Sequence, residues 1–282
     1  MVTSEESHCM EARKRTLRLG VLVSGGGTNL QALIDRSRSG DLAAEVVVVV
    51  SDNKDAYGLV RAQAASIPAH VVHYRGRRGQ EPSGSSLAPL PSDLDEIARK
   101  QRILKNPDPS ARREQLTRLL LAERELIGFL DRYRPDYICL AGFMRLVTPY
   151  FLSHFNHDGQ WRVLNIHPAL LPSFPGQHGY DDTYHYGGKW GGVTVHFVDE
   201  GEDTGPIIAQ APFPIWPNES LEGMRKRGLN IEYEVYAQCV NWLAAEQVRI
   251  EHTSTGRIKT RITDPQYPDI LARWMHQALS PI

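Results

Sequence analysis

The chain has 282 residues, with 32 basic and 33 acidic side chains, a formal net charge of −1 and a hydrophobic share of 41%. This composition supports an ordinary globular core, and the length fits one α/β domain with insertions. The balanced charge provides no general attraction for nucleic acid, and no apolar run approaches the roughly 20 residues that cross a bilayer. We therefore expect neither a nucleic-acid partner nor a membrane partner.

The N-terminus and the cysteines indicate the compartment. Residues 1–18 carry three glutamates and no apolar stretch, unlike a secretory signal, and we expect residues 1–16 to form a flexible extension. Cys9, Cys139 and Cys239 are widely spaced and odd in number, which indicates buried or free thiols in a reducing compartment. No cluster of histidine, cysteine and carboxylate indicates a metal site. The sequence thus predicts a cytoplasmic protein without a metal.

The predicted elements begin with a strand over residues 17–23, a glycine turn over 24–29 and a helix that starts near Leu30. Five consecutive valines at 46–50 predict a strand buried on both faces, which is typical of a parallel sheet covered by helices. Apolar periodicity then predicts a helix over 57–65 and a strand over 70–74.

The composition changes after this strand. Residues 75–111 are rich in glycine, proline, serine and charge, so we expect a surface insertion that contains one short helical piece and is at least partly disordered. We expect residues 76–108 to be dispensable for chemistry. The remaining pattern predicts a helix over 114–133, strands over 137–140, 163–166, 193–198 and 207–214, a helix over 221–245, a β-ribbon over 249–262 and a tail over 263–282.

Strands that alternate with helices predict an α/β fold. We expect a doubly wound, mostly parallel, Rossmann-like sheet with an antiparallel C-terminal portion, in one domain over residues 17–262. Ligands bind such sheets at the carboxyl ends of the strands. Polar residues and glycines stand at these ends here: residues 24–25, 51–53, 142–143 and 165–167.

The sequence SGGGTN at 24–29 joins a strand to a helix. Its glycines let the backbone turn sharply and approach a ligand, and the helix start offers unpaired N–H groups that suit a phosphate. Leu30 stands where a dinucleotide fingerprint has its last glycine, and the lysine of a P-loop is absent. A monophosphate is therefore favoured over a dinucleotide or a triphosphate, and a tight turn without a ligand is the alternative.

Asn165 and His167 lie on one face of a strand that ends at Pro168, because side chains alternate in direction along a strand. An amide beside an imidazole suits acyl transfer. The asparagine can stabilise negative charge on a carbonyl oxygen, and the histidine can donate a hydrogen bond or shuttle a proton. A structural histidine at the strand end is the alternative.

An acidic loop over residues 199–206 follows the strand over 193–198. Gly205 and Pro206 restrict its conformation and can turn Asp203 inward toward His167. A buried carboxylate there would raise the pKa of the imidazole and hold its orientation. A solvated turn is the alternative.

Five segments in this order resemble the glycinamide ribonucleotide transformylases, a family of folate-dependent formyltransferases of purine synthesis. They are SGGGTNLQALID, SDNKDAYGLVRA, PDYICLAGFMRLVTPYFL, VLNIHPALLPSFPG and VTVHFVDEGEDTGPIIAQ. The match runs from about residue 17 to residue 251, with the insertion interrupting it. It implies the formyltransferase fold and transfer of a formyl group from 10-formyltetrahydrofolate, the co-substrate, to the amine of glycinamide ribonucleotide.

The resemblance also implies roles for individual residues, in a monomer or a homodimer. Catalytic roles fall to Asn165, His167 and Asp203, phosphate binding to Gly26, Gly27, Thr28 and Asn29, ribose binding to Glu232, and folate binding to Met144, Arg145, Leu146, Val147 and Asp203. Arg113 or Arg118 is expected near the ligands. The sequence departs from the family at Tyr233, where a histidine is usual, and over residues 179–192, which leaves roles for His178 and His185 open.

Other functions use the same three catalytic residues. A formyltetrahydrofolate deformylase would use water as the acceptor, and a sugar-nucleotide formyltransferase would use another amine. A formyltransferase of initiator tRNA is disfavoured because little sequence follows the catalytic region.

Two further functions would not use these three residues. A non-catalytic nucleotide-binding module would not need them, and a dinucleotide-dependent dehydrogenase would need the full glycine fingerprint.

Overall fold

One sheet organises the chain. The computed structural model describes residues 16–74, 93–157 and 159–280, and within these residues seven strands form a sheet in the order β3-β2-β1-β4-β5-β6-β7. Strands β1 to β5 run parallel, β6 is antiparallel to β5, and β7 is antiparallel to β6. The predicted sheet, mostly parallel with an antiparallel C-terminal portion, is confirmed. The strands are β1 (Leu17–Val23), β2 (Ala44–Ser51), β3 (Ala69–Val71), β4 (Tyr137–Leu140), β5 (Val163–His167), β6 (Trp190–Phe197) and β7 (Ile207–Pro214).

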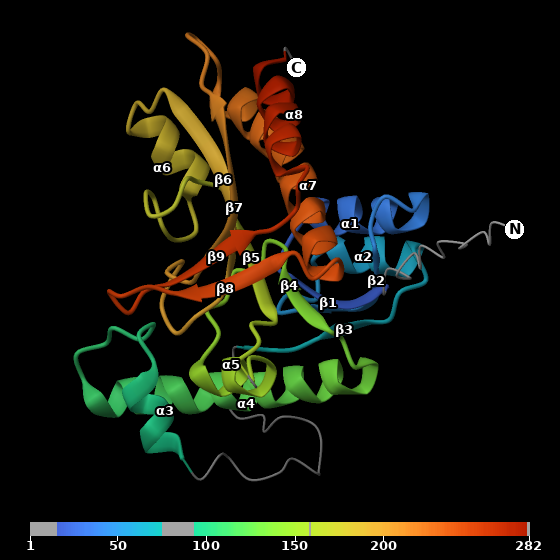
Figure 1. Cartoon of the computed structure of the whole chain (residues 1–282). Coiled ribbons are helices and arrows are strands. Elements are labelled where there is room, and N and C mark those ends of the chain that lie inside the picture. Colours follow the sequence, from blue (N-terminus) through green and yellow to red (C-terminus); the bar gives the residue numbers. More distant parts are fainter. Residues whose placement is uncertain (1–15, 75–92, 158, 281–282) are drawn as a thin grey trace, which may run out of the picture.

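Helices cover both faces of this sheet, with α1 and α7 above it and α4 and α5 below it in Figure 1. The valines of β2 show why. Val49 packs in the core that α1 and α7 share, whereas Val48 and Val50 pack in the core beside α4. The helices are α1 (Thr28–Ser39), α2 (Tyr57–Ala64), α3 (Leu94–Lys100), α4 (Pro109–Tyr133), α5 (Pro149–Phe155), α6 (Gly179–His185), α7 (Leu221–Ala244) and α8 (Tyr267–Leu279).

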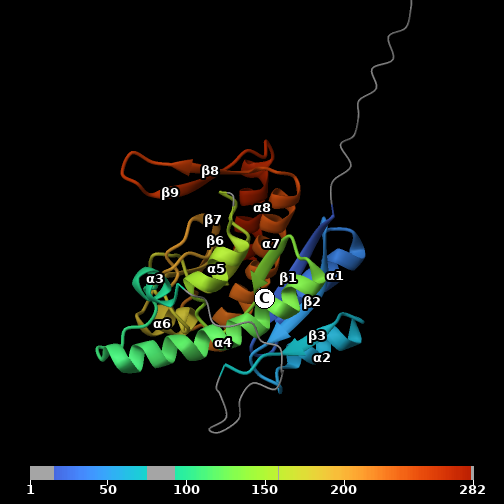
Figure 2. The ribbon, with the colours of Figure 1, turned by 90° about the horizontal axis from the view of Figure 1, so that it is seen from below.

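The C-terminal part of the described chain adds a ribbon and a helix. The predicted β-ribbon is β8 (Val248–His252) paired antiparallel with β9 (Ile258–Ile262), and it projects from the body in Figure 2. The residues after it, which the sequence pattern left as a tail, form α8. Trp274 of α8 is buried and its ring centroid lies 5.8 Å from that of Trp242 in α7. This helix therefore belongs to the main core.

The segment assigned to an insertion is partly outside the described residues. Residues 75–92 lie outside the described residues. The remainder of the segment, residues 93–111, contains α3, which is the predicted short helical piece, and the start of α4. The helix expected from residue 114 begins at Pro109, because Asp108 caps it by accepting hydrogen bonds from the amides of Ser110 and Ala111 at 3.0 and 3.3 Å.

Two of the three cysteines lie in the described chain. Cys139 and Cys239 are buried and unpaired, as expected, and Cys9 falls in the undescribed N-terminal residues. Among the helices of residues 16–74, 93–157 and 159–280, none is long and apolar enough to span a bilayer.

A buried carboxyl group joins α4 to the start of α5. Glu123 accepts hydrogen bonds from the amide of Thr148 at 2.6 Å and from the Thr148 hydroxyl. Burial raises the pKa of Glu123 to about 8, although the bonds from Thr148 act in the opposite direction. The folded protein therefore holds a proton on Glu123 that the unfolded chain releases near pH 4.5.

We expect the Glu123→Gln variant to lose a pH dependence of stability. Because the folded-state pKa is raised, this carboxyl contributes stability below pH 4.5 that is lost as the pH rises through about 8. The slope is at most ~1.4 kcal/mol per pH unit. The free energy of unfolding, measured by urea titration at pH 5, 6.5 and 8, should fall less steeply in the variant than in the wild type. Equal slopes would show that Glu123 is ionised in the fold.

Candidate active site

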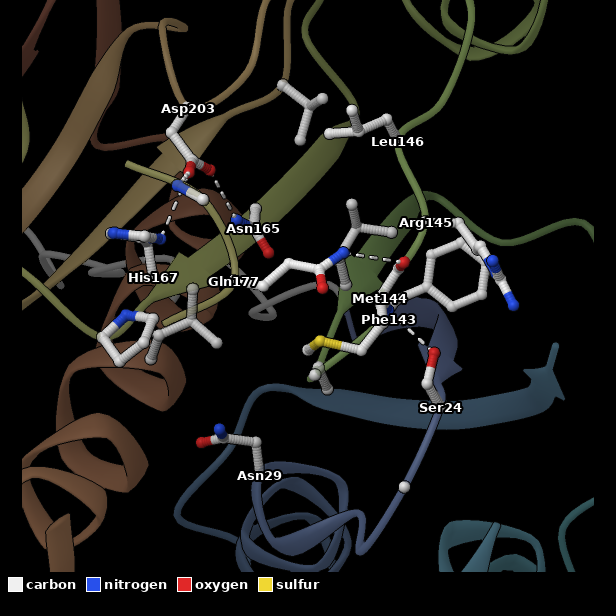
Figure 3. Close-up of a pocket in the computed structure, with 18 of the residues that line it drawn as sticks. Ser24, Asn29, Phe143, Met144, Arg145, Leu146, Asn165, His167, Gln177 and Asp203 are labelled. Carbon is white, nitrogen blue, oxygen red and sulfur yellow. Dashed lines mark hydrogen bonds and ion pairs between the residues drawn. The ribbon is translucent and has the colours of Figure 1, made fainter. Parts of the chain in front are cut away.

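A cavity of about 430 Å³ lies at the carboxyl ends of β1, β4 and β5. This is the edge at which parallel sheets bind ligands. Figure 3 shows Asp203, Asn165 and His167 on one side of the opening and Asn29 and Ser24 on the opposite side. The site residues named from the sequence all line this cavity: Gly26, Gly27, Thr28, Asn29, Met144, Arg145, Leu146, Val147, Asn165, His167, Asp203 and Glu232.

The glycine loop between β1 and α1 lines this cavity. Gly27 has a φ of 66° and stands at the N-cap of α1, with no side chain that caps the helix. A Cβ on Gly27 would lie 2.7 Å from the Cα of Gly58, so α2 packs against this glycine. By contrast, a Cβ on Gly25 or Gly26 meets nothing within 4 Å. Gly27 is thus needed for packing, whereas Gly25 and Gly26 leave room for a ligand.

A buried hydrogen-bond network lies beside the glycine loop. Glu232 of α7 accepts hydrogen bonds from Asn29 Nδ2 at 2.6 Å and from the Tyr180 hydroxyl. Burial raises the pKa of Glu232, and these two bonds only partly offset the shift. Among the described residues, the Asn29 Oδ1 atom is buried without a hydrogen-bond partner. The network therefore contains one buried acceptor without a partner.

The loop after β4 forms a more apolar side of the cavity. Met144 and Leu146 are exposed, although both are large apolar residues. The amide of Met144 donates a hydrogen bond to Ser24 Oγ at 2.8 Å, and Arg145 pairs with Asp52 at the end of β2. The loop is thus tied to β1 and β2 while its apolar side chains remain available.

Asn165, His167 and Asp203 are brought together as the sequence predicts. His167 Nδ1 lies 3.3 Å from Asp203 Oδ2, and Asn165 Nδ2 donates a hydrogen bond to Asp203 Oδ1 at 3.4 Å (Figure 3). The Nε2 atom of His167 lies 2.8 Å from the carbonyl oxygen of Phe174. A carbonyl oxygen can only accept, so Nε2 carries the hydrogen and Nδ1 of the neutral ring has the lone pair.

The expected charge of His167 requires a correction. The sequence argument predicted that a neighbouring carboxylate raises the pKa of this imidazole. In the structure, burial lowers the pKa of His167, and the Asp203 carboxylate opposes this shift without reversing it. The sequence indicates the charge of Asp203 but not the loss of solvent around the His167 ring. The resting imidazole is therefore mostly neutral at pH 7.

The carboxyl group of Asp203 is ionised. Burial raises the pKa of Asp203, but the Gly176 amide and the hydrogen bond and positive charge that His196 and His167 supply when their rings are protonated outweigh it, so the net pKa is lowered. The Gly176 amide donates to Asp203 Oδ2 at 2.7 Å. The neutral imidazole of His167 can therefore accept a proton, because the negative charge of Asp203 stabilises the imidazolium that results.

The backbone of the acidic loop explains how Asp203 turns inward. A Cβ on Gly205 would lie 1.9 Å from the carbonyl oxygen of Phe197, so this position admits only glycine. Asp203 itself has a φ of 55°, a left-handed conformation that aspartate tolerates better than most residues. The loop is therefore held in one conformation that orients the carboxylate.

His196 is a site residue that sequence reasoning missed. It stands opposite Asn165 in the β5–β6 pairing, and its Nε2 lies 3.2 Å from Asn165 Nδ2. The Nδ1 atom of His196 lies 2.8 Å from the Phe197 carbonyl oxygen, so Nδ1 is the donor and Nε2 accepts from Asn165. A histidine inside the apolar strand before the acidic loop was the available signal.

The arginines and histidines that the sequence left open lie away from the cavity. Arg113 pairs with Asp95, and Arg118 pairs with Glu114, both on the exposed surface. His178 stands at the N-cap of α6 and His185 in its last turn, and neither lines the cavity. Arg61 of α2 instead contacts the glycine loop, and its Nε donates to the Gly26 carbonyl at 2.8 Å.

Comparison with known proteins gives a consistent assignment. The formyl transferase family model matches residues 17–240. The phosphoribosylglycinamide formyltransferase of Haemophilus influenzae is 32% identical over 234 residues, which cover 83% of this chain and 90% of that protein. The residues that the family model matches include the glycine loop, β5 and the acidic loop.

Solved structures agree with this assignment. Glycinamide ribonucleotide transformylase 1 from Symbiobacterium toebii has a TM-score of 0.66 and 36% identity, over 89% of this chain and 95% of that one. A formyltetrahydrofolate deformylase from Pseudomonas syringae pv. tomato has a TM-score of 0.64 over 88% of this chain and 66% of that one, but only 22% identity, which shows the fold alone. Because the family model spans most of the sequence, this chain belongs to the formyl transferase family.

Proposed function

We propose that this protein transfers a formyl group from 10-formyltetrahydrofolate to the amine of glycinamide ribonucleotide, in purine biosynthesis. The observation that carries the proposal is the joining, in one cavity, of a glycine loop at a helix start with the Asn165, His167 and Asp203 cluster. The relatives at 32 and 36% identity carry names for this activity. The family supports a formyl-folate as the co-substrate, and the unpaired buried thiols fit a reducing, cytoplasmic setting.

The acceptor substrate fits the side of the cavity that holds the glycine loop. Its phosphate would lie at Gly26, Gly27, Thr28 and Asn29, where the uncapped start of α1 offers N–H groups and the positive end of the helix dipole. Its ribose would lie beside Glu232 and Asn29. Both residues line the cavity. This placement leaves Met144, Arg145, Leu146 and Val147 for the folate.

The chemistry follows from the protonation states. The substrate amine attacks the formyl carbon, and its nitrogen becomes acidic as the new C–N bond forms. The neutral His167, whose lone pair faces ionised Asp203, accepts the proton and becomes an imidazolium that the carboxylate stabilises. The proton then passes to the folate nitrogen as the old C–N bond breaks. The ring thus acts first as a base and then as an acid.

Asn165 would stabilise the oxyanion that forms on the formyl oxygen. Both of its amide hydrogens have acceptors in the resting site, His196 Nε2 at 3.2 Å and Asp203 Oδ1 at 3.4 Å. The longer contact is the weaker one, so one N–H can turn from Asp203 to the oxyanion. His196 would keep the amide in place during this exchange.

One assay tests the proposal. The purified chain is incubated with glycinamide ribonucleotide and 10-formyltetrahydrofolate, and release of tetrahydrofolate is followed with and without the acceptor. Release that depends on the acceptor supports formyl transfer. Release that ignores every sugar phosphate would support a deformylase, and release that depends only on an amino sugar nucleotide would support a sugar-nucleotide formyltransferase.

We expect the Gly26→Val variant to bind the acceptor at least ~10-fold more weakly and to keep its folate affinity. Gly26 is the suitable position, because a Cβ there meets nothing within 4 Å and a larger side chain only fills space that the phosphate needs. Gly27 is unsuitable, since any side chain there would strike Gly58 and disturb α2. Calorimetry with each ligand measures the two affinities.

The control ligand is the acceptor without its phosphate. Wild type and variant should bind this dephosphorylated acceptor with similar, low affinity. If Gly26→Val binds the phosphorylated acceptor as the wild type does, the glycine loop does not hold the phosphate.

A further inference from the structure

The turn between α3 and α4 reaches the active-site cavity. Ile103 lies in this turn, is only 8% exposed, and lines the same cavity as Leu146, Val198 and Asp203. The sequence composition predicts a surface insertion over residues 75–111, of which we expected residues 76–108 to be dispensable for chemistry. The structure places one apolar side chain of that segment in the wall of the site.

The turn has a defined conformation. Gln101 Oε1 accepts hydrogen bonds from the amides of Ile103 at 3.1 Å and Leu104 at 2.7 Å, which closes the chain directly after α3. Helix α3 is anchored in turn, because its Ile97 packs in a small core with Leu116 and Leu120 of α4. The backbone that carries Ile103 is thus fixed on its N-terminal side.

The same turn contacts the acidic loop that carries Asp203. The Arg102 amide donates a hydrogen bond to the Glu200 carbonyl oxygen at 3.3 Å. Lys105 Nζ lies 3.8 Å from Glu202, but the lysine side chain is 79% exposed, and such a pair contributes little. The backbone bond and the burial of Ile103 are therefore the contacts that matter.

We propose that Ile103 and its turn, residues 101–105, form a wall of the folate subsite and determine affinity for the co-substrate. An aliphatic side chain offers no hydrogen bond to a phosphate or a ribose, so it suits an apolar, flat part of the folate. Leu146 and Val198, which line the same cavity, have the same character, whereas the glycine loop follows β1. The inference rests on the proposed function, since it takes a formyl-folate as the ligand.

The Ile103→Ala variant tests this wall. We expect at least ~10-fold weaker binding of tetrahydrofolate, measured by calorimetry, because an apolar pocket that loses methylene groups loses affinity by this order. The KM for 10-formyltetrahydrofolate should rise by a similar factor, while kcat and the affinity for the acceptor stay near wild type. The Ile103→Val variant should restore most of the folate affinity.

A matched control separates this effect from loss of stability. Ile127 of α4 is also buried, at 6% exposure, but it does not line the cavity. The Ile127→Ala variant should lower the melting temperature and leave tetrahydrofolate binding unchanged. Unchanged tetrahydrofolate binding by a folded Ile103→Ala variant would overturn the proposal, as would an equal loss in Ile127→Ala.

Direct binding also distinguishes the two proposals. If the wild type binds tetrahydrofolate but does not formylate glycinamide ribonucleotide, the proposed function fails while the Ile103 wall is still decided by calorimetry. If the wild type formylates the acceptor and Ile103→Ala retains full folate affinity, only the wall is wrong.

Discussion

Replacing His167 with alanine is expected to lower kcat by at least ~100-fold, the size typical of losing a positioned proton-transfer group. The ring is buried, its Nε2 is held by the Phe174 carbonyl, and its Nδ1 lies 3.3 Å from an ionised carboxylate. His196 Nε2 also lies near this carboxylate, 3.6 Å from Asp203 Oδ1, but it faces the amide of Asn165 as well. The KM values for both substrates should change much less than kcat.

The pH profile gives a second readout of the same variant. Because burial lowers the pKa of His167, the active neutral form persists below the usual histidine range, and kcat falls only as the pH drops through that lowered value. The acid limb should disappear in His167→Ala. The control is His185→Ala, since this exposed histidine in α6 lies outside the cavity. Near-normal turnover by folded His167→Ala would remove this residue from the mechanism.

The position of the site was predictable because topology determines it. Parallel strands end at one edge of a sheet, so residues far apart in sequence, such as Gly26 and Asn165, meet there once the strands are correctly assigned. The valine run of β2 and the alternation of β6 were strong enough to assign them. The spacing of Asn165 and His167 then placed both on one face of β5, and the close approach of Gly205 to the Phe197 carbonyl lets the acidic loop bring Asp203 toward them.

The features that were missed depend on contacts between distant segments. His196 acts through its register opposite Asn165, and Ile103 through a turn that meets the acidic loop about one hundred residues later in the chain. Local composition carries no signal for the contact of Ile103, and for His196 it offers only a histidine inside an apolar strand. The pKa of His167 was predicted with the wrong sign for a related reason, because the burial of a side chain is a property of the whole fold.

Replacing Asp203 with asparagine is expected to lower kcat by at least ~100-fold although the shape of the side chain is kept. The imidazolium that forms on His167 during transfer would lose its counter-charge. The asparagine oxygen would retain the hydrogen bond from Gly176, so its amide nitrogen would take the place of Oδ1, which Asn165 Nδ2 now faces at 3.4 Å. Two donors would then oppose each other, and Asn165 would have to turn from its position beside the substrate.

The pH dependence of this variant has a defined direction. The Asp203 carboxylate raises the pKa of His167 against the effect of burial, so its neutralisation should lower that pKa further and move the acid limb of kcat to lower pH. The control is Glu200→Gln, because this acidic side chain belongs to the same loop but is exposed and does not line the cavity. Turnover should be measured from pH 5 to pH 9, with thermal unfolding to confirm the fold. A folded Asp203→Asn variant with wild-type kcat and an unmoved acid limb would show that the charge of Asp203 takes no part in proton transfer.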